Sequence, residues 1–71
     1  MKILNLKGFK HVESNYLHKV VKMFVNADHI VSVTVYEPEH PYTVIQTTEG
    51  TIELEGNVSE PIMYQLVGRE L

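Results

Sequence analysis

The stretch IVSVTVY, residues 30–36, decides the fold class of this chain. It is β-branched or aromatic except for one serine, and this composition favours strands over helices. Because successive side chains of a strand point to opposite faces, apolar groups are expected on both faces of this strand. One face carries Val31, Val33 and Val35, and the other carries Ile30, Ser32, Thr34 and Tyr36.

A β-hairpin is predicted directly after this strand. The loop EPEHP, residues 37–41, contains two prolines, which lack the N–H that a sheet ladder requires. Residues 42–48 and 51–55 are the strands of the hairpin, and residues 49–50, Glu-Gly, make the tight turn between them. The second strand alternates cleanly, which is typical of a sheet with one face in water. Its inward residues are Ile52 and Leu54, and its outward residues are Thr51, Glu53 and Glu55.

A short C-terminal helix is predicted for residues 59–67. Ser59 is placed to cap its N-terminus, and Glu60 and Pro61 follow in the first turn, where an acid and a proline both suit a helix start. The apolar stripe of this helix is Ile62, Met63, Leu66 and Val67. Gly68 is expected to end the helix. A helix of about two turns persists only when it packs against other elements, so we expect it to cover the sheet.

The chain before residue 29 gives weaker patterns. Residues 1–6 are predicted to form a strand, residues 10–15 a polar loop, and residues 26–28, Asn-Ala-Asp, a turn. Residues 16–25 fit two patterns, a helix or a strand. The helix would present the stripe Leu17, Val20, Val21 and Phe24, with Ser14 or Asn15 as its N-cap. The β-branched and aromatic residues of this segment favour the strand.

These elements predict one mainly β domain over residues 1–71. Four to five short antiparallel strands would form a curled sheet or a small open barrel, with one short C-terminal helix. A domain of 71 residues has a thin core, and small scaffolds gain stability from disulfides, metals or oligomerisation. The chain has no cysteine, so we expect it to form a homo-oligomer. The lack of cysteine also fits a cytoplasmic location.

Charge is divided unevenly along the chain. The net formal charge of −3 argues against general nucleic-acid binding. Residues 1–25 hold five lysines and one glutamate, a charge of +4, while residues 26–71 hold one arginine and eight acids, a charge of −7. The basic half of one copy could attract the acidic half of another across a symmetric interface. Alternatively, the basic half could offer a cationic patch to an anionic ligand. No run approaches the roughly 18 apolar residues of a membrane span, so no membrane partner is expected.

The chain is not expected to be an enzyme, and no cofactor or metal is expected. The histidines are His11, His18, His29 and His40, and none stands in an HxH or HxxxH spacing. No serine lies in a GxSxG elbow, and the four glycines are scattered at predicted turns. Glu53 and Glu55 share a strand face, but such a pair is most often part of a solvated acidic face.

One stretch combines basic and aromatic side chains in a way that suits a ligand. Its residues are Tyr16, His18, Lys19, Lys22 and Phe24. On a strand, all of them except Lys19 share one face. Aromatic rings can stack on a base while cations hold a phosphate, so this face is a candidate site for a nucleotide-like small molecule at a subunit interface. In the plainer alternative, the rings belong to the core and the lysines shield an edge strand.

The segments FVNADHIVSV (24–33), TVIQTTEG (43–50) and VSEPI (58–62) together resemble the small FlbD-like proteins, which are associated with flagellar motility, and similar small proteins of bacteria and phages. The shared pattern is a strand, an Asn-x-Asp turn, a strand, a hairpin with a glycine turn, and a short helix that opens at serine. The resemblance covers residues 24–67, and the chain departs from it before Phe24 and in the loop at 38–41. It implies a small cytoplasmic β module without a defined catalytic residue, and it favours a strand for residues 16–25.

The sequence therefore predicts a non-catalytic interaction or regulatory module, which acts as a homo-oligomer or on a protein partner. A binder of a nucleotide-like small molecule, using the basic N-terminal face, is the first alternative. A weak nucleic-acid binder is the second, and the acidic composition disfavours it.

Overall fold

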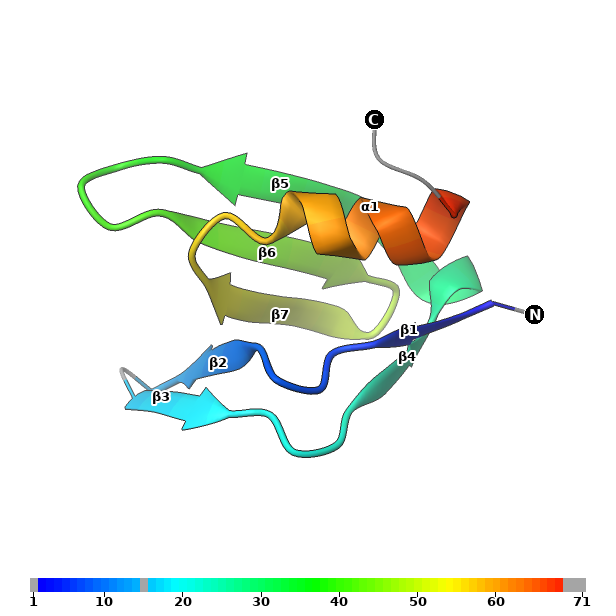
Figure 1. Cartoon of the computed structure of the whole chain (residues 1–71), viewed down its shortest axis with the longest axis horizontal. Helices are drawn as coiled ribbons and strands as arrows, with labels where there is room; N and C mark the ends of the chain where they lie inside the picture. The colour runs from blue at the N-terminus through cyan, green and yellow to red at the C-terminus, as the bar shows by residue number, and fades with distance from the viewer. Residues whose placement is uncertain (1, 15, 69–71) are drawn as a thin grey trace.

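The computed structural model describes residues 2–14 and 16–68, and these residues form a mainly antiparallel β fold with one short C-terminal helix (Figure 1). The strands are β1 (Ile3–Asn5), β2 (Lys10–Glu13), β3 (Tyr16–Lys19), β4 (Phe24–Asn26), β5 (Ile30–Tyr36), β6 (Tyr42–Thr47) and β7 (Gly50–Glu55). The helices are a 3₁₀ turn, η1 (Ala27–His29), and α1 (Ser59–Val67). The predicted fold class is confirmed, although the described residues contain seven strands rather than four or five. The strands form two sheets, and the larger one is not closed into a barrel.

The five-stranded sheet has the order β3-β2-β7-β6-β5, and its centre is the predicted hairpin. Ile45 of β6 lies opposite both Val33 of β5 and Ile52 of β7. Thr43 lies opposite Leu54 in the next inward row. Directly opposed residues share a face, so these side chains point to the same side of the sheet. The prediction that Ile52 and Leu54 face inward is confirmed, because Leu54 is fully buried and Ile52 packs on the core.

The bulge in β5 changes the predicted faces of that strand. The register with β6 shifts between Ile30 and Ser32, which leaves Val31 as the extra residue. Val31 is 62% exposed, whereas Val33 packs against the core. The expectation that Val31 shares the face of Val33 and Val35 is therefore wrong, because the bulge interrupts the alternation of side chains.

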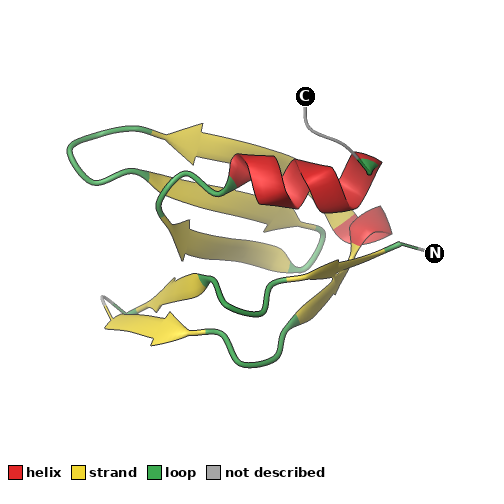
Figure 2. Cartoon of the chain, in the orientation of Figure 1, coloured by secondary structure: helices red, strands yellow, loops and turns green. Residues whose placement is uncertain are grey.

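The N-terminal part of the chain, residues 2–14 and 16–26, forms a bent antiparallel ribbon. β1 pairs with β4, and β2 pairs with β3. Between the two strand pairs, at the bend, three backbone hydrogen bonds join the first arm of the ribbon (residues 6–9) to the second arm (residues 20–23). They run from the Leu6 N–H to the Met23 carbonyl (3.0 Å), from the Gly8 N–H to the Val20 carbonyl (2.9 Å) and from the Val20 N–H to the Phe9 carbonyl (2.8 Å). Figure 2 shows the loops of this bend between the two strand pairs.

Two predictions for this region are corrected by the ribbon. Residues 10–13 form strand β2 rather than a loop, because they pair with β3 on one side and β7 on the other. Residues 16–25 are extended rather than helical, as predicted. They form parts of two strands in different sheets, with a bend at residues 21–22. Residues 1 and 15, which belong to the predicted first strand and loop, lie outside the described residues.

The core lies between one face of the large sheet and the layer formed by α1 and the β1–β4 pair. Its buried side chains are Leu4, Leu6, Val20, Ile45, Leu54 and Ile62. Figure 1 shows α1 in front of β5 and β6, on the face that Ile45 lines. Gln65 fixes the helix to β1 because its side chain accepts a hydrogen bond from the Asn5 N–H (2.7 Å) and donates one to the Asn5 carbonyl (2.8 Å). No helix in the described residues is long and apolar enough to cross a membrane.

The observed ends of α1 agree only in part with those predicted from the sequence. Ser59 does not cap the helix, because its N–H and its hydroxyl both donate to Oδ1 of Asn57, at 3.2 Å and 2.8 Å. Val58 occupies the cap position, and its side chain makes no capping hydrogen bond. Gly68 ends the helix as predicted, in the left-handed conformation at φ 78° that glycine adopts without strain.

The predicted turn at residues 26–28 is present as the start of η1. Oδ1 of Asn26 accepts a hydrogen bond from the Asp28 N–H at 2.9 Å, which is the local bonding that makes asparagine a good turn residue. This turn carries the chain from β4 in the small sheet to β5 in the large sheet.

Candidate functional site

Strand β5 is an open edge of the large sheet, with β6 as its one neighbour among the described strands. In an antiparallel sheet, alternate residues of an edge strand point their N–H and C=O groups away from the neighbouring strand. The seven residues of β5 present such groups over roughly 23 Å, at about 3.3 Å per residue. An edge of this kind can accept a strand from another chain.

The two edges of the sheet differ in how well they are protected. β3, at the other edge, has four residues and ends in His18 and Lys19. Short length and charge both discourage pairing with another strand. β5 has seven residues and none of them is charged. Its bulge lies at its N-terminal end, so residues 32–36 keep a regular register and an unprotected edge.

The β5 edge borders the sheet face that α1 leaves uncovered, where one aromatic ring and one threonine are exposed. Tyr36 is 47% exposed, and its ring stacks on that of Tyr42 with a centroid distance of 5.1 Å and an interplanar angle of 19°. Thr34 is exposed and lies opposite Val44, on the face away from the buried Ile45. The edge and this uncharged row of β5 side chains are accessible to a partner.

The five residues of the predicted ligand face do not form one face. Tyr16 and His18 lie on β3 with their ring centroids 6.5 Å apart, and Lys19 ends that strand opposite Lys10. The chain then bends at residues 21–22. Lys22, within the bend, and Phe24, after it, line a different surface from Tyr16, His18 and Lys19, so the five residues fall into two groups.

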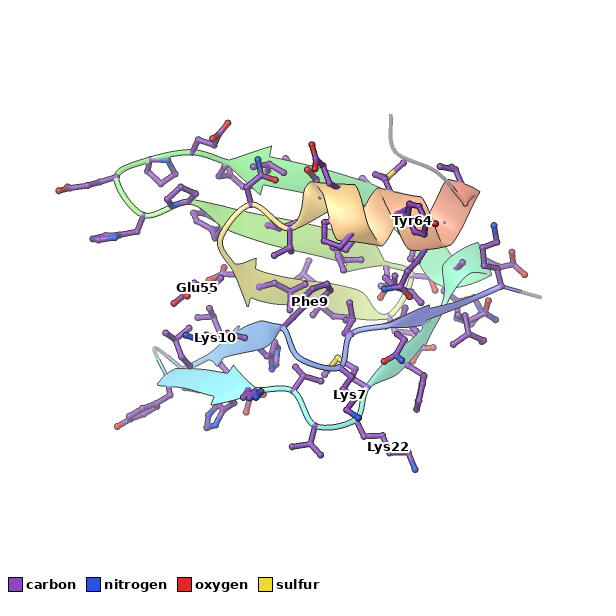
Figure 3. The ribbon with its side chains drawn as sticks, viewed as in Figure 1. Lys7, Phe9, Lys10, Lys22, Glu55 and Tyr64 are labelled. Atoms are coloured by element: carbon purple, nitrogen blue, oxygen red, sulfur yellow. The ribbon has the colours of Figure 1, made fainter. Side chains whose placement is uncertain are left out.

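Lys22 and Phe24 belong instead to a shallow hollow at the bend of the ribbon. The hollow is lined by Asn5, Lys7, Val21, Lys22 and Phe24. Val21 is 78% exposed and Phe24 is 57% exposed, so both present apolar surface there. Figure 3 shows the Lys7 and Lys22 side chains on this part of the ribbon, away from α1.

Sequence reasoning missed Lys7 and Val21 as members of this group. Lys7 lies on the first arm of the ribbon and Lys22 on the second, so only the pairing of the two arms brings them together. Gly8 is the one signal in the sequence from which this bend could have been found. Its φ of 93° is one that other residues rarely adopt, and its N–H bonds to Val20.

The other polar side chains of the described residues lie apart from this hollow. No group of three or more His, Asp and Glu side chains among the described residues is placed to hold a metal ion. Lys10 and Glu55 form an ion pair at 3.9 Å, and His29 lies 3.8 Å from Glu49, all on exposed side chains. A second hollow, beside β2 and β7, is lined by His11, Val12, Glu13, Ser14, Thr51 and Glu53.

A scan against protein-family models, a search of curated proteins and a search of solved structures each find no match to this chain. The resemblance to the FlbD-like proteins stays a prediction.

Proposed function

We propose that the chain is a non-catalytic interaction module that forms a homodimer through its β5 edge. The observation that carries this proposal is the seven-residue, uncharged strand β5, which pairs with β6 on one side and with no described strand on the other. Monomeric proteins usually protect such an edge with charges, prolines or bulges, and residues 32–36 contain none of these. Pairing with a second strand satisfies the free backbone groups of this edge.

The sequence of the regular part of β5 favours a second copy of this chain as the partner. Residues 32–36 read Ser-Val-Thr-Val-Tyr, in which Val33 and Val35 are placed symmetrically about Thr34. When two copies pair antiparallel across a twofold axis at Thr34, each Val33 lies opposite Val35 of the partner subunit. The inward apolar rows of the two sheets then join, and no like charges meet within the paired segments.

The size of the domain supports the same arrangement. The six fully or nearly buried apolar side chains make a small core, and domains of this size commonly gain stability by oligomerising. Edge pairing would extend the five-stranded sheet of each copy into one continuous sheet across the dimer.

The proposal is tested by light scattering on the wild-type chain and on two lysine variants. Thr34→Lys places a charge on an exposed edge position, where the monomer tolerates it. In the dimer, the same change puts two lysines opposite each other at the twofold axis. Gln46→Lys is the matched control, because Gln46 is exposed on the same sheet face but on the inner strand β6.

The wild-type chain and Gln46→Lys are expected to have the mass of a dimer, and Thr34→Lys that of a monomer with unchanged circular dichroism. A monomeric wild-type chain would overturn the proposal. A wild-type dimer that both variants disrupt would also overturn it, because the open sheet face rather than the edge would then be the interface.

A further inference from the structure

The hollow at the bend of the ribbon brings together two lysines from different arms of the chain. Lys7 follows β1 and Lys22 precedes β4, and the backbone pairs Leu6–Met23 and Gly8–Val20 hold these two segments side by side. The Lys7 N–H also donates to Oδ1 of Asn5 at 3.0 Å, which fixes the start of the turn. The positions of the two lysines are therefore set by the register of the ribbon.

Neither lysine is neutralised by a carboxylate in the part of the chain that the structure describes. The ion pairs found there join Lys10 to Glu55 and His29 to Glu49. The other residues that line the hollow, Asn5, Val21 and Phe24, carry no charge. The hollow therefore has two positive charges beside an apolar surface that includes an exposed aromatic ring.

From this combination we infer that the hollow binds a small soluble phosphate monoester that carries a flat ring. A phosphate monoester has a charge near −2 at neutral pH, so each of the two lysines that line the hollow can offer it one positive charge, whereas a carboxylate carries only one negative charge. The ring of the ligand packs on Phe24 and Val21. This inference is independent of the proposed function, because the hollow lies at the bend of the ribbon and its lining includes no residue of β5.

The charge distribution favours a small ligand over a nucleic-acid strand. Positive charge is concentrated in the first 25 residues, while residues 26–71 carry a formal charge of −7. A long polyanion would also meet the net negative charge of the whole chain, −3, whereas a monoester contacts only the hollow.

The inference is tested by NMR titration of the isotope-labelled full chain with phenyl phosphate. We expect saturable shifts confined to the backbone amides of residues 5–8 and 20–24. Lys7→Gln and Lys22→Gln are each expected to weaken binding about tenfold, the loss of one charge-assisted contact. Lys19→Gln is the matched control, because Lys19 is exposed on β3 and does not line the hollow, and it should bind like the wild-type chain.

Two further arms test the chemistry of the ligand. Phe24→Leu should lower the affinity for phenyl phosphate and leave the lower affinity for inorganic phosphate unchanged. Benzoate should bind the wild-type chain more weakly than phenyl phosphate does. Equal losses in Lys19→Gln and Lys22→Gln would overturn the inference, because binding would then follow total charge. Binding to vesicles of phosphatidic acid without binding of free phenyl phosphate would also overturn it, since the source of the phosphate would then be a lipid surface.

Discussion

The hydroxyl group of Thr43 joins strand β6 to the backbone of Val58, the residue that caps α1. It accepts a hydrogen bond from the Val58 N–H at 3.1 Å and donates one to the Gly56 carbonyl at 2.8 Å. Thr43 is fully buried, and its two hydrogen bonds satisfy a polar group that would otherwise be costly in the core. This one side chain holds the loop from the sheet to the helix.

Replacement of Thr43 by valine is expected to destabilise the chain by about 1–3 kcal/mol, because the shape is kept while the Val58 N–H and Gly56 carbonyl lose their partner. Urea unfolding followed by circular dichroism measures the effect. Thr51→Val, at an exposed position of β7, is the control and should change the free energy of unfolding by less than about 0.5 kcal/mol. Equal unfolding midpoints for the two variants would show that the Thr43 hydrogen bonds contribute nothing.

Ile62 is the buried anchor of α1 on the sheet. Ile62→Ala is expected to cost about 2–5 kcal/mol, since it removes a fully buried side chain and leaves a cavity. Thermal unfolding should show a fall in Tm of about 8 °C or more. Val67→Ala is the control on the same helix, because Val67 is largely exposed, and a similar loss of stability there would contradict the docking described for α1.

Local patterns predicted the part of the fold that depends on near neighbours in the chain. The strand at residues 30–36, the hairpin at 42–55 and the helix at 59–67 all carry clear periodicity, and all three are present. Residues 10–13, Lys-His-Val-Glu, have little strand propensity of their own. They become β2 because they pair with β3 and β7, which is a tertiary effect that the local sequence does not encode.

The candidate sites were less predictable than the elements that carry them. The sequence shows that the strand at residues 30–36 has no charge. Its position at the edge of the sheet depends on the strand order, which the sequence pattern does not reveal. The group of Lys7, Lys22 and Phe24 depends on the register of the ribbon, so a pattern read along residues 16–25 could not find Lys7. The prediction joined Lys22 to Tyr16 because it treated a segment with a turn as one straight strand.

Gly8 is expected to be required for the bend that forms the hollow. No heavy atom lies within 4 Å of a Cβ built at this position, so substitution acts through the backbone φ of 93° alone. Gly8→Ala should cost about 1–2 kcal/mol, and Gly8→Asn should cost less, because asparagine tolerates positive φ. Urea unfolding of both variants tests this order, and an alanine variant as stable as the wild-type chain would contradict it.

Residue-resolved hydrogen exchange on β5 tests the proposed dimer most directly. In a monomer, the β5 amides that point away from β6 exchange quickly, whereas pairing across the edge protects them. We predict that both sets of alternate amides in residues 32–36 are protected in the wild-type chain. In Thr34→Lys only the set bonded to β6 should remain protected. Rapid exchange of the outward set in the wild-type chain, at a concentration where light scattering gives a dimer, would contradict edge pairing.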